Sequence, residues 1–425
     1  MSTTNLNAQQ SYLKTDSNRL WQSLMEMARI GATDKGGCNR VAFSDEDRAG
    51  RELFIGWCEA AGCKVSVDQF GNLFARRAGK NNNLPAVIMG SHLDTQPTGG
   101  KFDGVYGVLA GLEVIRTLND LNVETEAPLE VAVWTNEEGC IFKPMLGSAV
   151  FTGLVPLQEA LAMREEKQGW SIQEGLERTG FAGSMPIYSY PVACYFELHI
   201  EQGPILEANN NVIGVVTAAQ GQRWYDLELE GQEAHAGPTP METRRDAMMG
   251  AARIILEIDR IGRSHNNARG TAGRVNVYPN SPNTIPGRVE FSGDLRHPEV
   301  SVLTQMDAEF RASAKQIAQD MGLKLSLSDR TYLPPLPFHP ELIETVRRYA
   351  IEEGEPWQDI VTGAGHDACQ MGQILPTTMI FVPCEDGISH NEAENAKQED
   401  LHAGCNVLCN SVRAVACGEV DLGTR

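Results

Sequence analysis

Short apolar runs alternate with amphipathic stretches along most of the chain. The runs at Pro85–Met89, Leu129–Trp134, Val192–Leu198 and Thr377–Val382 have the length and the predominance of apolar residues typical of strands buried on both faces. From about Gly104 to Asn119, apolar residues instead recur at helical spacing. Strands that alternate with helices predict an α/β domain built on a mixed, mostly parallel sheet flanked by helices.

A helix and a hairpin are predicted ahead of these strands. Ser44 begins a capping-box pattern and predicts a helix that ends near Gly62. Two short β-type runs follow, Lys64–Asp68 and Asn72–Arg76, and the residues between them are suited to a turn.

The middle of the chain has a different pattern and predicts a separate α+β unit inserted into the first domain. Its expected elements alternate as strand, helix, two strands, helix and strand, at Trp224–Leu229, Thr243–Ile261, Gly273–Tyr278, Arg288–Asp294, Val300–Met321 and Lys324–Leu327. Candidate ligands lie outside both ends of this insert. We therefore expect a discontinuous di-metal catalytic domain at residues 1–213 and 332–425, and an inserted domain at 214–331.

Charge and composition narrow the classes of partner. The 425 residues carry a formal net charge of −20, which disfavours binding to nucleic acid or to anionic membrane surfaces. No run approaches the ~20 apolar residues that span a bilayer, and the polar start, Met1–Ser11, does not resemble a secretory signal. The ten cysteines form no CxxC pair and are expected to be reduced thiols of a cytoplasmic protein.

Histidines and carboxylates share the loops that follow the predicted strands. Five of the nine histidines lie in such polar, glycine-rich loops: His92, His199, His235, His366 and His390. Acidic residues accompany them: Asp94, Asp103, Glu137, Glu138 and Glu201. Imidazole with carboxylate suits Zn, Mn, Co or Ni without any thiolate. A two-metal site needs one bridging carboxylate, about two further ligands per ion and one carboxylate left as a base, and this set supplies that number.

The loops contain six motifs: His92–Asp94, Gly100–Gly104, Asn136–Gly139, His199–Pro204, Glu233–Gly237 and Ser389–Asn391. Their order and spacing resemble the M20 metallopeptidase superfamily, and within it the hydantoinase/carbamoylase branch. That branch contains N-carbamoyl-L-amino acid amidohydrolases, β-ureidopropionases and allantoate amidohydrolases. The resemblance covers the chain from about residue 20 to about residue 415.

The resemblance implies two divalent metal ions per subunit. The implied ligands are His92 and His199 for one ion, Glu138 and His390 for the other, and Asp103 for both. The resemblance also implies a ferredoxin-like fold for the inserted domain, with a role as dimerisation domain and lid, and hence a homodimer.

The catalytic roles implied by the resemblance fall on neighbouring residues. Glu137 is the general base and later returns the proton to the leaving nitrogen, and Asp94 orients the ring of His92. The peptidase branches usually have a carboxylate where His199 stands, so this histidine favours the carbamoylases.

Three residues of the insert are implied to bind substrate. Arg296 and Asn283 would hold a substrate carboxylate, which the guanidinium fork suits. His235 would hydrogen-bond the developing oxyanion, from its own or the partner subunit. A surface ion pair, a turn and a helix-cap contact remain the respective alternatives.

Further candidates lie closer to the metal ligands. In the stretch Gly363–Asp367, backbone N–H groups, that of Gly365 among them, are suited to bind an anion of the substrate. His366 and Asp367 either contact substrate or only brace the loop. Gln202 is expected to line the pocket, and Glu201 is expected to brace His199.

These features predict a binuclear metal-dependent amidohydrolase. The expected substrate is a small ureido or carbamoyl acid, either an N-carbamoyl-L-amino acid or N-carbamoyl-β-alanine, and the products would be amino acid, ammonia and carbon dioxide. The alternatives are an allantoate amidohydrolase, a dipeptidase or aminoacylase of the wider superfamily, and a catalytically silent binding protein.

Overall fold

The chain forms two compact units in the computed structural model, which describes residues 12–423. Unit 1 comprises residues 1–217, 338–360 and 364–425 less its undescribed ends, and unit 2 comprises residues 218–337 and 361–363. Unit 2 thus begins four residues later than the predicted insert, ends six residues later and takes in a short second segment. The polar segment at residues 1–11, on which the absence of a signal was predicted, lies outside the described residues.

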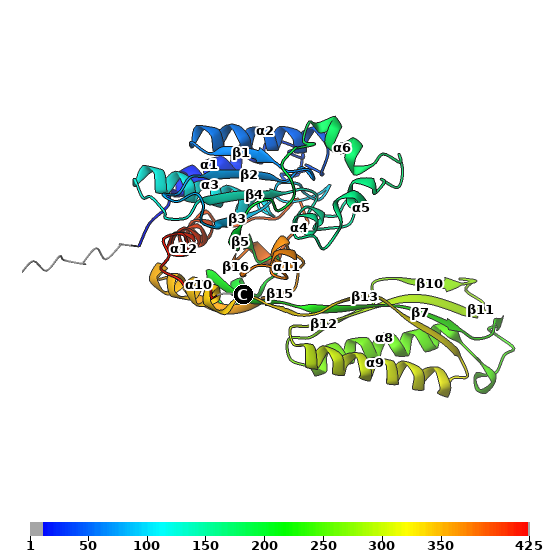
Figure 1. Ribbon diagram of the computed structural model, residues 1–425. Coiled ribbons are helices and arrows are strands. Elements are labelled where there is room, and N and C mark those ends of the chain that lie inside the picture. Colours follow the sequence, from blue (N-terminus) through cyan, green and yellow to red (C-terminus); the bar gives the residue numbers. More distant parts are fainter. Residues whose placement is uncertain (1–11, 424–425) are drawn as a thin grey trace, which may run out of the picture. The chain divides into compact units, whose positions relative to one another are not determined.

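A mixed nine-stranded sheet forms the centre of unit 1 (Figure 1). Its order is β1-β2-β4-β3-β5-β16-β6-β14, and β15 pairs with β6. The strands are β1 Lys64–Val67, β2 Leu73–Arg77, β3 Ala86–His92, β4 Leu129–Trp134, β5 Val192–Ile200, β6 Ile213–Ala219, β14 Leu336–Pro337, β15 Trp357–Thr362 and β16 Thr377–Val382. The four central strands, β4, β3, β5 and β16, are parallel. Strands β1, β2, β6 and β14 pair antiparallel along this order. The predicted fold class is confirmed.

Helices cover both faces of this sheet, which explains why its central strands are buried almost throughout, although they include polar residues such as Glu130 and Glu197. Successive strand residues point to opposite faces. On β5, Glu197 accepts a hydrogen bond from the main chain of Ala368 in α11, whereas the neighbouring Leu198 packs against Gly404 in α12. The helices of unit 1 are α1 Ser17–Met27, α2 Asp45–Ala60, α3 Val105–Asp120, α4 Leu146–Phe151, α5 Leu157–Ala162, α6 Ile172–Thr179, α7 Ile205–Ala208, α10 Pro340–Glu353, α11 Asp367–Met371 and α12 Gln398–Ala416.

The local predictions at the N-terminal end are confirmed. Ser44 is the N-cap of α2, and its hydroxyl accepts a hydrogen bond from the main-chain N–H of Asp47. Strands β1 and β2 pair as an antiparallel hairpin.

Unit 2 is an antiparallel sheet with two helices, α8 Ala247–Ser264 and α9 Val300–Asp320, packed on it (Figure 1). The strand order is β10-β12-β7-β13, and β9 also pairs with β12. This is the order of a ferredoxin-like fold in which β7, β10, β12 and β13 are its four strands. The strands of unit 2 are β7 Gly221–Glu230, β8 Ala234–His235, β9 Arg269–Thr271, β10 Val275–Tyr278, β11 Thr284–Ile285, β12 Arg288–His297 and β13 Lys324–Leu333.

Two predicted boundaries in unit 2 are wrong. Helix α8 begins at Ala247 rather than Thr243, because Asp246 caps it by accepting from the N–H groups of Met248 and Met249. Strand β13 continues to Leu333 instead of ending at Leu327, because it pairs with the whole length of β7 across an irregularity near residue 330.

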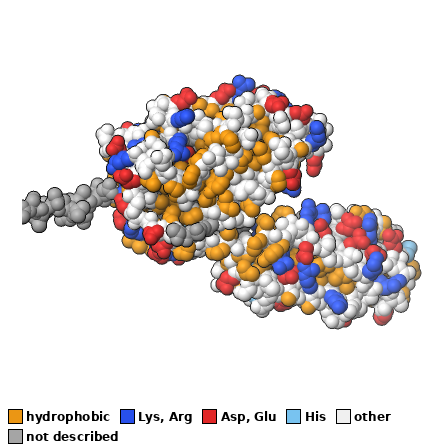
Figure 2. Space-filling view, viewed as in Figure 1, with side chains coloured by type: hydrophobic (Ala, Val, Ile, Leu, Met, Phe, Trp, Pro, Cys, Tyr) orange, Lys and Arg blue, Asp and Glu red, His pale blue; other side chains and the backbone are white. Residues whose placement is uncertain are grey.

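The surface charges and the cysteines can be compared with the expectations drawn from composition. On the face drawn in Figure 2, basic and acidic side chains are interspersed rather than gathered into a field of one sign. Within the described part of the chain, no helix is both long enough and apolar enough to cross a membrane. All ten cysteines are free thiols.

Candidate metal centre

His92 ends strand β3, and its ring is fixed by the main chain. Its Nδ1 atom lies 2.9 Å from the carbonyl oxygen of Asp94. A carbonyl oxygen only accepts, so Nδ1 carries the hydrogen and the lone pair of the neutral ring is on Nε2. This Nε2 atom lies 3.6 Å from Oδ1 of Asp103 and 3.6 Å from Oε2 of Glu137.

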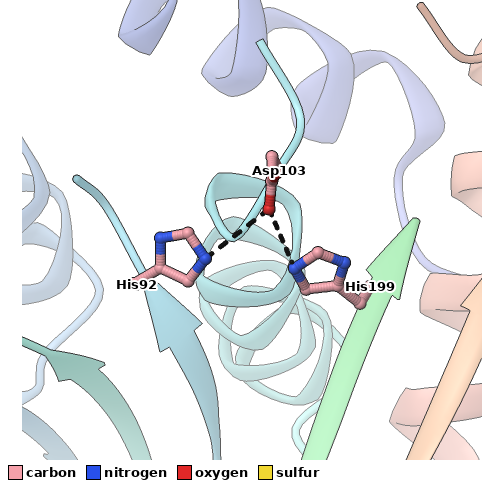
Figure 3. Close-up of side chains that lie close together, drawn as sticks. All are labelled: His92, Asp103 and His199. Atoms are coloured by element: carbon pink, nitrogen blue, oxygen red, sulfur yellow. Dashed lines mark ion pairs between the residues drawn. The ribbon is translucent and has the colours of Figure 1, made fainter. Parts of the chain in front are cut away.

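His199, near the end of β5, is fixed in the same way. Its Nδ1 atom lies 2.8 Å from the carbonyl oxygen of Ile200, which leaves the lone pair on Nε2. That Nε2 atom is 3.2 Å from Oδ1 of Asp103. Figure 3 shows both rings turned toward this one oxygen, from two neighbouring strands.

Asp103 lies in the loop before α3, where the chain passes very close to His92. Gly104 has a φ of 66°, and a Cβ atom at this position would lie 2.3 Å from the His92 ring. Glycine is therefore required here on both grounds. The loop brings the Asp103 carboxylate, which is 4% exposed, between the imidazoles.

The second oxygen of Asp103 faces another pair of residues. Nε2 of His390 lies 3.3 Å from Oδ2 of Asp103 and 3.4 Å from Oε2 of Glu138. Two groups with metal-ligating geometry thus share Asp103: His92, Asp103 and His199 form one, and Asp103, Glu138 and His390 form the other.

The pKa shifts in this cluster indicate that its carboxylates are stabilised by nearby positive charge. Burial raises the pKa of the Asp103 carboxyl, but contacts with His199 and the other two imidazoles hold it well below its usual range. Burial and the Asp103 charge raise the pKa of Glu138 to about 7, and contact with Asp103 raises the pKa of His390 to about 8.

An observation that does not depend on the pKa values also indicates that these ligands suit a divalent cation. The Nε2 lone pair of His92 faces an Asp103 carboxylate oxygen, an arrangement in which two acceptors oppose each other unless a proton or a cation lies between them. Nε2 of His199 faces the same oxygen and also accepts from the main-chain N–H of Gly104 at 3.1 Å. Imidazole nitrogens and carboxylate oxygens, without thiolates, are ligands suited to Zn, Mn, Co or Ni.

Glu137 and Glu138 are directed to different places by one turn. The carboxylate of Asp94 accepts hydrogen bonds from the main-chain N–H groups of both, at 3.3 and 3.2 Å. Glu137 is 8% exposed, and burial raises its pKa well above the ordinary value. Glu138 is held by Gln96, whose side-chain amide donates to Oε2 at 2.8 Å.

Asp94 contacts His92 chiefly through its main chain. The carbonyl oxygen takes the ring hydrogen at 2.9 Å, while the nearest carboxylate oxygen is 3.9 Å from Nδ1. The contact by which Asp94 orients the ring is thus made by its main chain, and its carboxylate binds the turn of the two glutamates.

A third group of potential ligands, Glu197, His199 and His366, is occupied by protein donors. Glu197 accepts from the hydroxyl of Ser91 and the N–H of Ala368, both at 2.7 Å. Both nitrogens of His199 already have partners. His366 packs edge-on to His199 with ring centroids 4.6 Å apart, and burial with the nearby His199 lowers its pKa well below the usual value.

The loop around His366 is braced within unit 1. His366 is the N-cap residue of α11, a helix of five residues. Asp367 accepts a 2.5 Å hydrogen bond from the hydroxyl of Ser148. Gly365 is exposed, and a Cβ atom at its position would lie 3.0 Å from the side chain of Met145.

The side chains of the adjacent residues Gln202 and Glu201 make contacts in different places. Nε2 of Gln202 donates to Oδ2 of Asp103 at 2.8 Å, which places this side chain at the ligand cluster. The expectation that Glu201 braces His199 is wrong. Its carboxylate instead accepts from the N–H groups that begin α7, at 2.8 and 2.7 Å, since those groups lack partners within the helix.

The three substrate-binding candidates of unit 2 lie at two ends of one strand. His235 pairs with Thr284, and the carbonyl of Asn283 accepts from Ala236, so His235 and Asn283 are neighbours. This end of the sheet is where Arg288 of β12 pairs with Glu230. Arg296 lies eight residues further along β12, about 27 Å away at ~3.4 Å per residue.

Arg296 is held in place by its own surroundings. Its guanidinium pairs with Asp294 at 2.9 Å and donates to the carbonyl oxygen of Gly363 at 2.9 Å. Because of the distance along β12, Arg296 and Asn283 of one chain cannot grip the same carboxylate.

Sequence reasoning missed two residues that hold the ligands. Glu394 is 1% exposed and accepts from the N–H of Asp103, and burial with the Asp103 charge raises its pKa to about 7. Gln96 fixes Glu138. Both follow a motif residue closely, Glu394 four residues after His390 and Gln96 two after Asp94, but nothing in their spacing indicates burial.

The comparisons with known proteins identify the family. Residues 88–414 match the family described as peptidase family M20/M25/M40, so the chain belongs to that family. It is 45% identical over 405 residues to an N-carbamoyl-L-amino-acid amidohydrolase from Rhizobium meliloti, covering 95% of this chain and 97% of the relative. It is 33% identical to an allantoate amidohydrolase from Bacillus subtilis, covering 92% of this chain and 95% of the relative.

A solved structure of the hydantoinase/carbamoylase family supports the same placement. An amidase of that family from Burkholderia multivorans superposes with a TM-score of 0.92 at 53% identity, covering 95% of this chain and 99% of that one. The predicted family branch and the predicted enzyme class, a hydrolase of amide C–N bonds, are confirmed.

Proposed function

We propose that the protein is a binuclear metal-dependent amidohydrolase that cleaves the linear amide C–N bond of N-carbamoyl-L-amino acids. The observation that carries the proposal is the position of Asp103, whose two oxygens face two separate groups of imidazole and carboxylate donors. One carboxylate between two such groups is the arrangement that a pair of metal ions requires.

The proposed ligands divide between the two ions. His92 and His199 hold one, Glu138 and His390 hold the other, and Asp103 holds both, as the Nε2 and carboxylate distances of 3.2 to 3.6 Å support. When bound, such ions polarise a carbonyl oxygen and lower the pKa of water. Main-chain carbonyls keep the hydrogens of His92 and His199 on Nδ1, so that the lone pair of each ring is on Nε2. At His199 a bound ion would replace the hydrogen bond that Nε2 accepts from the N–H of Gly104.

Glu137 is the proposed general base. Its Oε2 atom lies 3.6 Å from Nε2 of His92, beside the ligands rather than among the two ligand groups. Oε2 takes a proton from the attacking water and passes it to the leaving nitrogen, which then departs as ammonia. Because burial raises the pKa of Glu137 well above its usual value, the carboxylate depends on nearby positive charge to be ionised at neutral pH.

Substrate binding is proposed to involve two subunits. Arg296 offers a guanidinium fork to the substrate carboxylate, while His235 hydrogen-bonds the oxyanion and Asn283 assists beside it. Since about 27 Å of β12 lies between Arg296 and Arg288, at the end of the sheet near His235 and Asn283, we propose that one site contains all three in a homodimer, with His235 and Asn283 from the partner.

The closeness of the named relatives favours the carbamoyl substrate over allantoate, at 45% against 33% identity. An ammonia-release panel over N-carbamoyl-L-α-amino acids, N-carbamoyl-β-alanine, allantoate and dipeptides tests this choice. The proposal predicts the highest kcat/KM for an N-carbamoyl-L-α-amino acid. A higher value for allantoate, for N-carbamoyl-β-alanine or for a dipeptide would assign the enzyme to that substrate instead, and no turnover of any would indicate a silent binding protein.

A further inference from the structure

Glu394 is a buried carboxylate that joins two loops far apart in the sequence. It lies in the loop after β16, four residues beyond His390, and is 1% exposed. Its Oε1 atom accepts hydrogen bonds from the main-chain N–H groups of Phe102 and Asp103, at 3.0 and 3.1 Å. Its Oε2 atom accepts from the hydroxyl of Ser389 at 2.8 Å. The side chain therefore connects the loop of Asp103 with the loop of His390.

The packing around Glu394 leaves its carboxylate little freedom. A Cβ atom at Gly100 would lie 2.1 Å from Oε1 of Glu394, so the backbone of the Asp103 loop lies directly against the carboxylate. Glycine at this position permits that approach. The N–H groups of Phe102 and Asp103 are buried with it and would lack partners if the carboxylate were removed.

Ser389 extends the connection to the shared ligand itself. Its hydroxyl lies 2.8 Å from Oε2 of Glu394 and 3.1 Å from Oδ2 of Asp103. A hydroxyl carries one hydrogen and donates to only one of these carboxylates at a time. Glu394 thus acts on Asp103 at two points, the main-chain N–H and, through Ser389, the carboxylate oxygen that faces His390.

We infer that Glu394 is a positioning residue. Its hydrogen bonds hold the Asp103 loop against the His390 loop and thereby set the spacing of the ligands Asp103, Glu138 and His390. The inference rests on the proposed two-metal function. Glu394 makes its contacts through hydrogen bonds to protein groups and is not one of the ligands. Outer partners of this kind typically change metal affinity by about 10- to 100-fold when they are lost.

The choice of substitution separates positioning from ligation. In Glu394→Gln, the amide oxygen still accepts from Phe102 and Asp103, and the amide nitrogen donates to Ser389, whose hydrogen is then free to bond Asp103. The hydrogen bonds between the two loops are therefore kept, and only the negative charge is lost. Glu394→Ala removes every contact. Glu385→Ala, an exposed glutamate in the same loop with no described side-chain partner, is the matched control.

The experiment is a calorimetric titration of the metal-free full-length variants with Mn²⁺, alongside thermal unfolding of each. We expect the weaker of two sites to lose about 10- to 100-fold in affinity in Glu394→Ala, while Glu394→Gln and Glu385→Ala stay within about threefold of wild type. Turnover by Glu394→Ala should recover as Mn²⁺ is raised, which a general loss of folding would not allow. If Glu394→Ala does not fold, Glu394→Asp, which draws the carboxylate back by one methylene, replaces it.

The possible outcomes are distinct. Wild-type affinity in Glu394→Ala overturns the inference, and equal losses in Glu394→Gln and Glu394→Ala overturn it in favour of direct ligation. A wild-type protein that binds no divalent ion overturns the proposed function itself, whatever the variants do.

Discussion

Nε2 of His199 lies 3.2 Å from Oδ1 of Asp103, although the Nδ1–H group of the same ring donates its hydrogen bond to the carbonyl oxygen of Ile200. His92 repeats the arrangement against the same oxygen at 3.6 Å. Nε2 of His199 also accepts from the main-chain N–H of Gly104 at 3.1 Å, so the opposed lone pair without a protein donor is that of His92. A positive charge between this ring and the carboxylate makes the arrangement favourable, which indicates a site suited to a cation.

The shared position of Asp103 predicts that one substitution disables both ion sites. Asp103→Asn removes the charge that both ligand groups contact and should lower metal affinity by at least about 100-fold, with turnover falling in parallel. Metal analysis after dialysis checks this, with the exposed Asp34→Asn as control. Retention of both ions at wild-type affinity would show that Asp103 does not bridge them.

The adjacent glutamates provide a matched pair. Glu137→Gln should retain the ions but lose about 10²- to 10⁴-fold in kcat, since it removes only the proposed base. Glu138→Gln should instead lose an ion, since Oε2 of Glu138 faces His390 at 3.4 Å. Measuring kcat and metal content of both variants decides the assignment, and the reverse pattern would exchange the two roles.

The separation of Arg296 from His235 predicts complementation between subunits. Arg296→Ala and His235→Ala should each be nearly inactive alone. Mixed by unfolding and refolding together, they should regain about a quarter of wild-type activity, because half of the dimers are hybrids and each hybrid has one intact site. No recovery, from a mixture shown to contain hybrids, would place all the working groups in one chain.

Metal binding should depend on pH in a defined window. His390, with a pKa of about 8, and Glu138, with a pKa of about 7, both lose a proton on ligation. Affinity for Mn²⁺ should therefore rise from pH 6 to 8 and level off above that. Calorimetry across this range, in buffers of different ionisation enthalpy, should also detect proton release. A flat profile would exclude these two residues as ligands.

The same shift affects the stability of the metal-free protein. The pKa of Glu138 is about 7 in the folded state, above the ordinary 4.5, so the folded state holds the proton more tightly than the unfolded chain. Its contribution to stability is therefore full below pH 4.5 and is lost as the pH rises through 7. Denaturant unfolding of wild type and Glu138→Gln should show a smaller fall over this window in the variant.

The sequence predicted the central strands, the two-part organisation and the loops that meet at the metal centre, because apolar runs and their polar ends are local signals. It did not predict the edge strands β6, β14 and β15. Strand ends such as His92 and His199 converge once the central strands are parallel. Glu394 and Gln96 were not predicted, since their roles depend on burial between loops that are distant in the chain. The separation of Arg296 from Asn283 depends on strand register, which one sequence does not display.

The most direct test of the account is a crystal structure of the Mn²⁺-loaded enzyme with anomalous scattering measured at the metal edge. The account predicts two ions about 3.5–4 Å apart, one contacted by His92 and His199, the other by Glu138 and His390, with Asp103 contacting both. A single ion, or ions bound away from Asp103, would contradict it.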